Sequence, residues 1–325
     1  MHYKRRLLSP RGTGERRLQV IMASSFPRSH LVVSLVLSLL LVLLPAGFSA
    51  SKDGPLTYHG GPILQGEVNF ALLWYGQWGK VQKSAISTFI KSLNTPGTSG
   101  AQPKVTSWWK TIESYQAAAR KGNRPIKVKV AKTTTDASYS QGKVITEDVY
   151  IPALVKKATG GDPNLVAVIF TSRQVTVQGI CTGACSLHGT IDKTAYIVVG
   201  NPETECPGFC DWPFAQPKNS KGVTLKPPSG DIGADATVIN FATALAGAVT
   251  NFNNTGFYAG APTKPTEAIT ACSGIFGGGA SKDNPGKVNI DSKNGGAFNA
   301  EGVNNQKFLL PGVWNPNTKS CWTLL

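Results

Sequence analysis

Acidic side chains are scarce in this sequence, and charge of either sign is sparse. Asp and Glu number 18 against 33 Lys and Arg, a formal net charge of +15, and charged residues make up only 16% of the chain. This is too little charge for a disordered polyelectrolyte, and the hydrophobic content of 41% is enough to build a folded core. Beyond residue 49 the chain keeps 26 basic and 17 acidic residues, so the part expected to fold carries a charge of +9.

Long hydrophobic runs are missing too, with one exception near the start. Residues 31–44 read LVVSLVLSLLLVLL, fourteen residues without a charge, with Arg28 before them and small residues at 49–50 after them. A membrane-spanning helix needs about 20 apolar residues, whereas the core of a signal peptide needs about 7 to 15. We therefore predict a leader and secretory signal peptide over 1–49, with Met22 as an alternative start, and one domain over 50–325. After cleavage we expect no stable membrane insertion; an uncleaved anchor is the alternative.

Cysteines are few, and all of them follow the signal segment. An even number in a secreted chain predicts disulfides, although six cysteines allow 15 pairings and the sequence does not choose among them. A zinc site at Cys181, Cys185 and His188 is the alternative, but the spacing is unlike that of zinc motifs and an oxidising route favours sulfur pairing. We predict no metal and no cofactor. The cysteines expected in disulfides are Cys181, Cys185, Cys206, Cys210, Cys272 and Cys321.

Apolar runs of strand length alternate with helical patterns along the rest of the chain. The expected strands are 68–75, 126–130, 165–171 and 195–199, of which 126–130 alternates as a strand nearer an edge does. The expected helices are 80–94, 108–119 with Thr106 or Ser107 as cap, a third from near Thr146 to Ala158, and 235–249. This order predicts a single α/β domain with a mostly parallel or mixed central sheet and flanking helices. The Gly- and Asn-rich chain after residue 250 is expected to form a loop-dominated cover tied down by Cys272 and Cys321.

Ordered motifs run through the chain from residue 56 to residue 321. They include 58–62 (YHGGP), 107–111 (SWWKT), 181–189 (CTGACSLHG), 200–214 (GNPETECPGFCDWPF), 230–235 (GDIGAD) and 308–314 (FLLPGVW). In number and order these motifs resemble those of the plant EXORDIUM family, also called phosphate-induced protein 1. Two local departures are Ser186, where the family usually has Gly, and Phe252, where Pro is usual.

The resemblance implies a secreted protein of the plant cell wall and apoplast. It also implies a role in promoting cell expansion during hormone- and carbon-responsive growth, and it brings no established catalytic activity. We therefore expect a growth regulator that is not an enzyme. The alternatives are a wall polysaccharide-binding module and a wall-active hydrolase.

The helix expected at 235–249 bears on the hydrolase alternative. Residues 243–251 (TALAGAVTN) resemble the H-E-L-x-E-A-x-T-D pattern of a metalloprotease-like helix, but Thr243, Ala244 and Gly247 replace its His and acidic positions. Catalytic zinc needs about three protein ligands and a group that activates water. We expect either a degenerate zincin-like scaffold or simply an Ala/Gly-rich helix that packs closely, and no zinc-dependent peptidase activity.

Only two histidines, His59 and His188, follow the signal segment, so any histidine-based chemistry depends on them. Both suit structural roles in loops, and we keep them, with Trp212 of the second cysteine motif, as candidate ligand-binding residues. Asp231 and Asp235 are close enough in sequence to face one another, but Asp231 is better placed to cap the following helix. No nucleophile elbow or phosphate-binding loop is present in the sequence. We assign no catalytic residue.

Aromatic and basic side chains suggest partners. The clusters 74–78 (WYGQW) and 108–109 (WW) could stack on sugar rings if exposed, although core packing is the commoner role of Trp. The surplus of cations could hold the protein on acidic pectin, and an extracellular receptor is the other candidate partner. Secretion removes nucleic acid from reach. Asn253, in the sequon NNT, is the predicted glycosylation site.

Overall fold

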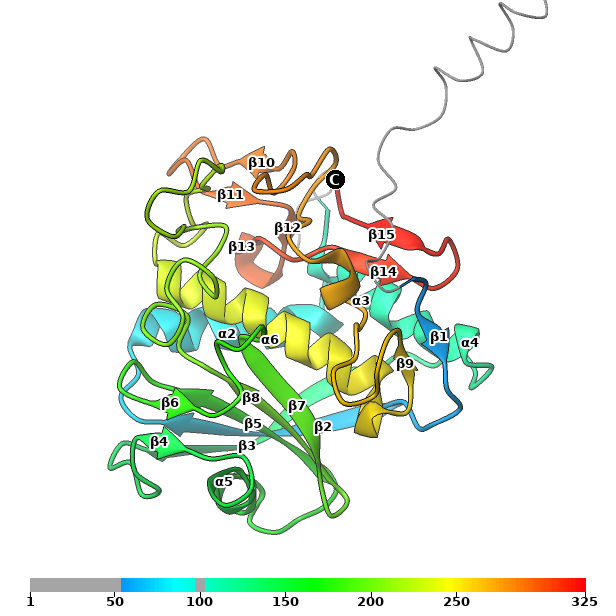
Figure 1. Ribbon diagram of the computed structural model, residues 1–325, viewed down its shortest axis with the longest axis vertical. Coiled ribbons are helices and arrows are strands. Elements are labelled where there is room, and N and C mark those ends of the chain that lie inside the picture. The colour runs from blue at the N-terminus through cyan, green and yellow to red at the C-terminus, as the bar shows by residue number, and fades with distance from the viewer. Residues whose placement is uncertain (1–53, 97–102) are drawn as a thin grey trace, which may run out of the picture. The chain divides into compact units, whose positions relative to one another are not determined.

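The computed structural model describes residues 54–96 and 103–325. The predicted leader and signal peptide, residues 1–49, and the cleavage point lie outside the described residues. The central sheet consists of β2 (Glu67–Tyr75), β3 (Lys127–Asp136), β5 (Leu165–Thr171), β7 (Ser186–Ile191) and β8 (Thr194–Val199). Its order is β3-β2-β5-β8-β7, with β7 antiparallel to β8 and all other neighbours parallel (Figure 1). The predicted α/β class with a mixed central sheet is confirmed.

Burial explains which strands the sequence predicted well. The β2, β5 and β8 strands are buried on both faces, so their runs are apolar throughout, and β3 lies at an edge, as its alternation predicted. The β7 strand was not predicted, and His188 was wrongly assigned to a loop. All six β7 residues are only partly buried, and Ser186, His188 and Gly189 give the strand no apolar run.

Helices cover the two faces of the sheet differently. On one face lie α2 (Lys80–Asn94) and α6 (Ile232–Thr250), and on the other lies α5 (Tyr150–Thr159), as Figure 1 shows. The α6 helix is long and apolar enough to span a membrane by composition, but it is buried in the core and apolar nearly all round. Its first turn is capped by Asp231, whose Oδ1 accepts a hydrogen bond of 2.8 Å from the Ala234 N–H, as predicted.

The bounds of three helices differ from the prediction, and one of them is α6, which was expected over 235–249 and spans Ile232–Thr250. The second helix is divided into α3 (Val105–Glu113) and α4 (Tyr115–Ala118), and neither Thr106 nor Ser107 caps it, since Lys104 holds the N-cap position. The division falls at Ser114, whose Oγ donates to the Thr111 carbonyl at 2.7 Å and so competes with regular helix bonding. The α5 helix begins at Tyr150, later than Thr146, which leaves Pro152 in its first turn, where a missing N–H is tolerated.

The C-terminal part forms the expected loop-dominated cover. Its short strands are β9 (Phe257–Tyr258), β10 (Asn289–Ile290), β11 (Ala297–Phe298), β12 (Ala300–Glu301), β13 (Lys307–Phe308), β14 (Val313–Asn315) and β15 (Ser320–Trp322), and each belongs to a two-stranded pair. The β9 strand pairs with β1 (Thr57–Tyr58), and a disulfide joins Cys272 to Cys321. The cover packs on the α2/α6 side, where Phe308 enters the main core and Leu309 packs in a cluster with Ile239. One further two-stranded pair, β4 (Val144–Ile145) with β6 (Thr176–Val177), lies outside the cover.

The order of the parallel strands creates a switch point. From β2 the chain crosses to β3 on one side, and from β3 it returns past β2 to β5 on the other side. In open α/β sheets, ligands bind in the crevice outside the carboxyl ends of the strands at such a point. The carboxyl ends of β2 and β5 are therefore where the fold itself favours a site.

Candidate functional site

A pocket lies at this switch point. It has a volume of about 360 Å³ and is lined by residues that follow three parallel strands, by the first turn of α2 and by the residue before α6. Ser172 and Arg173 follow β5, Asn201 follows β8, and Asp231 precedes α6. The remaining lining residues, between β2 and the first turn of α2, are Gln77, Trp78, Gly79, Lys80, Val81 and Gln82.

The turn that leaves β2 brings its backbone against the end of β5. Gly76 has φ of 91°, and a Cβ there would collide with the Ser172 side chain, so only glycine fits. The Gly76 N–H donates to the Asp136 carbonyl at 2.8 Å, and the Ser172 N–H donates to the Tyr75 carbonyl at 2.9 Å. These contacts hold the pocket wall close to the sheet.

The pocket carries opposite charges near one another. Arg173 Nη1 lies 3.5 Å from Glu203 Oε2, and both Lys80 and Asp231 line the same space. Asn201, 2% exposed, accepts a hydrogen bond of 3.0 Å from Thr204 Oγ1 at its Oδ1. The sequence analysis missed this site, although a GNP motif directly after a central strand could have indicated it.

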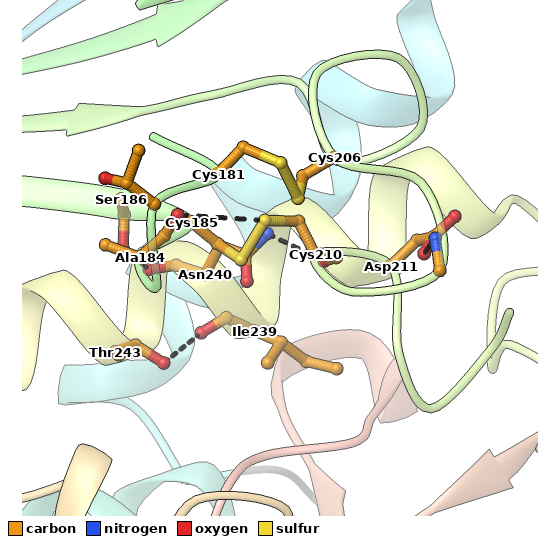
Figure 2. Close-up of a disulfide and its surroundings, with 12 residues drawn as sticks. Cys181, Ala184, Cys185, Ser186, Cys206, Cys210, Asp211, Ile239, Asn240 and Thr243 are labelled. Atoms are coloured by element: carbon orange, nitrogen blue, oxygen red, sulfur yellow. Dashed lines mark hydrogen bonds between the residues drawn. A yellow bond between two sulfur atoms is a disulfide. The ribbon is translucent and has the colours of Figure 1, made fainter. Parts of the chain in front are cut away.

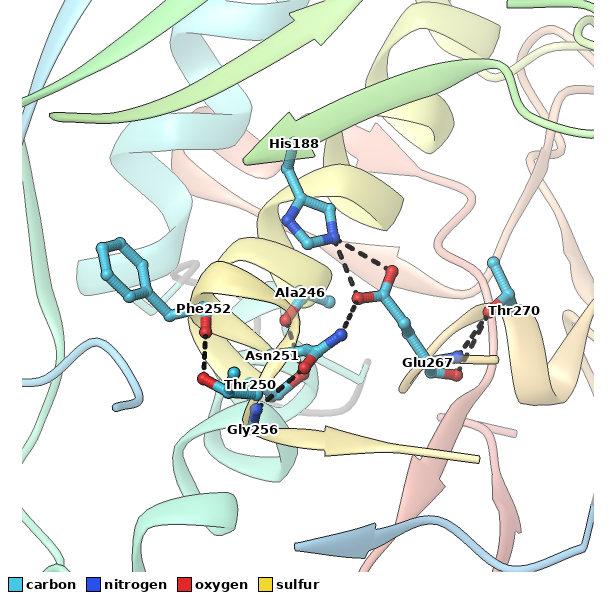
Figure 3. Close-up of polar contacts among 9 residues, drawn as sticks. His188, Ala246, Thr250, Asn251, Phe252, Gly256, Glu267 and Thr270 are labelled. Carbon is cyan, nitrogen blue, oxygen red and sulfur yellow. Dashed lines mark hydrogen bonds and ion pairs between the residues drawn. The ribbon is translucent and has the colours of Figure 1, made fainter. Parts of the chain in front are cut away.

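His188 lies elsewhere, in an ion pair whose two side chains are 10% and 14% exposed. Its Nε2 is 2.9 Å from Glu267 Oε1 and 3.0 Å from Oε2, and Asn251 Nδ2 donates to Glu267 Oε1 at 2.6 Å (Figure 3). The three side chains come from β7, the end of α6 and the cover, so the pair joins three parts of the chain. Glu267, which lies 79 residues from His188, was not a predicted partner. Because the two residues are so far apart in the sequence, nothing in the sequence indicated that they would meet.

Burial and charge oppose each other at this pair. Burial alone would lower the pKa of His188, but the Glu267 carboxylate raises it above the ordinary value of 6.5. Burial alone would raise the pKa of Glu267, but His188 and Asn251 together lower it below 4.5. An imidazolium facing a carboxylate is therefore the stable state in mildly acidic solution.

The degenerate zincin scaffold finds no support in the geometry of α6. Thr243 Oγ1 donates to the Ile239 carbonyl of its own helix at 2.9 Å, and Ala244 is buried. Gly247 leaves room for a histidine of another element, because a Cβ there would lie 2.5 Å from His188 Nε2. The geometry fits the other expectation, that α6 is a helix whose small residues allow close packing.

All six cysteines are paired. Cys181 bonds Cys206 and Cys185 bonds Cys210, so the two C-x-x-x-C motifs are joined in parallel, and Figure 2 shows both bonds beside α6. Asn240 Nδ2 of α6 donates to the Cys210 carbonyl at 3.0 Å. The disulfide prediction is confirmed, and because the sulfur atoms are bonded to one another they are not available as zinc ligands.

The other candidate residues are dispersed. His59 stacks on Tyr258 with ring centroids 3.7 Å apart, and its Nε2 lies 3.2 Å from the Tyr258 carbonyl. Trp212 packs against Phe276 of the cover at 5.5 Å. None of His59, His188 and Trp212 lines the switch-point pocket. Asn253 is exposed, and its Oδ1 accepts from Thr190 Oγ1 at 2.7 Å.

Most of the tryptophans suggested as a sugar platform are in the core. Trp74, Trp108 and Trp109 are 3%, 1% and 2% exposed, so a platform built from them is wrong. The indole N–H groups of Trp108 and Trp109 donate to buried carbonyls at 2.8 and 3.0 Å. Trp78 is the exception, because it is only partly buried and lines the pocket.

The two carboxylates at the start of α6 have separate roles. Asp231 caps the helix, while buried Asp235 accepts hydrogen bonds of 2.8 Å from both the N–H and the Oγ of Ser229. Burial raises the pKa of Asp235 to about 7. Neither residue has the other as a hydrogen-bonding partner in the described part of the chain, and Asp235 does not line the pocket.

Exposed cations gather on one stretch of the chain. We call it the basic edge; it consists of Arg120, Lys121, Arg124, Lys127, Lys129 and Lys132, all exposed, and no acidic residue stands between Glu113 and Asp136. The pairing of β3 with β2 shifts its register by one residue between Phe70 and Ala71. As a result, Lys132 pairs with Ala71, and Lys127 pairs with Glu67. Since side chains alternate along a strand, this shift keeps all three β3 lysines on the α5 face.

Comparison with known proteins identifies the family. The family model described as "Phosphate-induced protein 1 conserved region" matches residues 56–324. Protein EXORDIUM-like 2 and Protein EXORDIUM, both of Arabidopsis thaliana, are 41% and 40% identical to this chain; the alignments cover 86% and 90% of this chain and 94% and 97% of the relatives. Protein PHOSPHATE-INDUCED 1 of Nicotiana tabacum is 36% identical over 83% of this chain and 88% of its own length.

The chain therefore belongs to the phosphate-induced protein 1 family, which includes the EXORDIUM proteins. The resemblance found in the motifs is confirmed. No solved structure matches the chain.

Proposed function

We propose that this protein is secreted into the plant cell wall and apoplast, where it promotes cell expansion in hormone- and carbon-responsive growth. Three disulfides support an oxidising, extracellular destination. The role in growth is the one that membership of the EXORDIUM family suggests.

The protein acts by binding and not by catalysis. Its two histidines beyond the signal segment are in structural contacts, His59 against Tyr258 and His188 against Glu267, and neither faces the pocket. General acid or base catalysis by a histidine needs the imidazole within hydrogen-bonding reach of a reacting group. These positions support a role as a binding protein.

The basic edge is the observation that carries the proposal of wall attachment. A chain of acidic sugars offers repeated carboxylates, and a row of exposed lysines and arginines without intervening acids offers repeated partners for them. Within the described part of the chain, Lys129 is the one edge residue in an ion pair, with Glu67 at 2.7 Å, and this pair is exposed and weak. Acidic pectin is therefore the proposed wall partner.

Binding to polygalacturonate tests this proposal. Lys127, Lys129 and Lys132 are replaced by Gln together, and the matched control replaces the exposed Lys218, Lys221 and Lys282 with the same change in net charge. We expect the β3 variant to bind about tenfold more weakly, the control to bind as the wild type does, and added salt to weaken wild-type binding. Equal binding by the two triple variants would refute the role of the basic edge.

A further inference from the structure

We propose that the switch-point pocket binds a neutral carbohydrate, as one or two sugar rings of an oligosaccharide. This proposal concerns a different surface from the basic edge and a different chemistry from acidic pectin. It therefore goes beyond the proposed wall attachment, and either proposal can fail without the other.

The position and size of the pocket support a ligand site. It lies outside the carboxyl ends of β2, β5 and β8, where the strand order reverses, and the loops after all three strands contribute to it. Its volume of about 360 Å³ is within the range of small-molecule sites in proteins.

Trp78 supplies an aromatic surface that is held in place. Its ring packs against Trp74 with centroids 5.3 Å apart and against Phe170 at 6.1 Å, both of which are core residues. Trp78 is partly buried and lines the pocket. The core therefore holds the ring in place, and part of the ring stays accessible from the pocket. The C–H face of a sugar ring packs on such a fixed aromatic surface with little loss of side-chain entropy.

Polar groups around Trp78 can pair with hydroxyls. Asn201 is 2% exposed, and its Oδ1 accepts from Thr204 Oγ1, while its Nδ2 has no partner among the described residues. An amide N–H group at a pocket wall can donate to a sugar hydroxyl. Asp231 uses Oδ1 to cap α6, so its Oδ2 can accept a hydroxyl proton.

The charge balance selects a neutral ligand. Lys80, Arg173 and Asp231 line the pocket, and Arg173 is already paired at 3.5 Å with Glu203, which lies outside the lining. An anionic sugar would have to approach the Asp231 carboxylate in the lining, whereas a neutral one can donate to that carboxylate and accept from the cationic groups. The uncharged hydroxyls of a sugar make both kinds of hydrogen bond.

Titration calorimetry on the mature protein tests the proposal. The ligands are cellotetraose, xylotetraose and mannotetraose, with tetragalacturonate for comparison. Three variants are compared with the wild type: Trp78→Ala, Asn201→Asp and Asp231→Ser, the last of which keeps a capping hydroxyl. Phe209→Ala, which removes an exposed aromatic ring outside the pocket, is the matched control. Thermal melting establishes that each variant is folded.

We expect at least one neutral tetrasaccharide to bind, with affinity about tenfold weaker in Trp78→Ala and in Asn201→Asp and unchanged in Phe209→Ala. If Trp78→Ala does not fold, the Asn201 and Asp231 variants decide. The proposal is wrong if no neutral tetrasaccharide binds at millimolar concentration, if the pocket variants bind as the wild type does, or if tetragalacturonate binds the pocket more tightly than the neutral sugars.

Discussion

Gly247 and His188 share a space that only one side chain can fill. A Cβ at residue 247 would lie 2.5 Å from His188 Nε2 and 3.0 Å from Glu267 Oε2, and the imidazole has little freedom because it is ion-paired. The sequence analysis singled out both residues: Gly247 because it replaces an acidic residue of the metalloprotease-like pattern, and His188 because it is one of two histidines after the signal segment. It could not bring them together, because their contact depends on how β7 packs on α6.

Gly247→Ala is expected to destabilise the protein by about 1 to 3 kcal/mol, since the added methyl group overpacks the core. Helix propensity alone predicts the opposite sign, a gain of about 1 kcal/mol. Urea unfolding at pH 6 measures the effect. In a His188→Ala background the same substitution should be neutral or stabilising, and a loss of equal size in both backgrounds would show that His188 is not the cause.

The His188–Glu267 pair predicts a particular dependence of stability on pH. Because the folded pKa of His188 is raised, its contribution is fully present below about pH 6.5 and is lost as pH rises through the folded pKa. Because the folded pKa of Glu267 is lowered, its contribution is present above about pH 4.5 and is lost as pH falls through its folded pKa. The pair therefore stabilises most between these two values.

Unfolding free energies measured from pH 4 to pH 9 test this dependence. Above pH 6.5 the wild type should lose at most about 1.4 kcal/mol per pH unit from His188. The double variant His188→Gln/Glu267→Gln should lack this part of the slope. A variant with the same pH profile as the wild type would contradict the ion-pair account.

Helices and strands with a clear hydrophobic pattern could be predicted from the sequence. Elements whose position depends on contacts with distant parts of the chain could not. The α2 helix matches its predicted range and β5 matches its own, because burial imposes a pattern on each. The β7 strand has no such pattern, and its place at the sheet edge comes from pairing with β8 and from the tandem disulfides on its N-terminal side. The cysteine pairing was equally beyond the sequence, since spacing does not reveal which motif faces which.

The disulfides are expected to differ in their contribution to stability. The Cys272–Cys321 bond closes a segment of 49 residues alone, whereas the other two bonds each close 25 residues side by side. Replacing Cys272 and Cys321 by Ser should cost about 4 kcal/mol, because loop-closure entropy is restored to the unfolded chain. Removing only one of the tandem bonds should cost less, since its neighbour still closes almost the same loop.

Denaturant unfolding of the three paired Cys→Ser variants measures this order, with thiol titration as the control that the remaining cysteines stay oxidised. If removal of Cys181–Cys206 alone proved more damaging than removal of Cys272–Cys321, the loop-closure explanation would fail.

For the whole molecule, the sequence predicted the class of fold and the family, and it missed the strand order. The switch-point pocket depends on that order, because residues after β2, β5 and β8 meet only when these strands are neighbours. The basic edge depends likewise on the register shift in β3, which no composition reveals. Both surfaces are properties of the assembled sheet. For this reason, the count of charges could suggest pectin as a partner but could not indicate which surface would bind it.

Secretion predicts what an apoplastic extract should contain. We expect the protein recovered from wall fluid to begin within a few residues of Ala50, because the apolar run at 31–44 directs the signal peptidase to the small residues after it. Asn253→Gln should also lower the apparent mass, because it removes the predicted glycosylation site. N-terminal sequencing and gel mobility measure the two effects. A mature chain that still began before Leu31 would rule out cleavage.

Elongation of seedlings that lack the protein is the most direct measurement of the central claim, a secreted growth promoter that acts from the wall by binding. The seedlings are supplied with equal amounts of the wild type, the β3 lysine variant or the Lys218/Lys221/Lys282 control. We predict that the wild type and the control restore cell length and that the β3 variant, washed from the wall, does not. Full restoration by the β3 variant, or no restoration by secreted wild-type protein, would contradict the account.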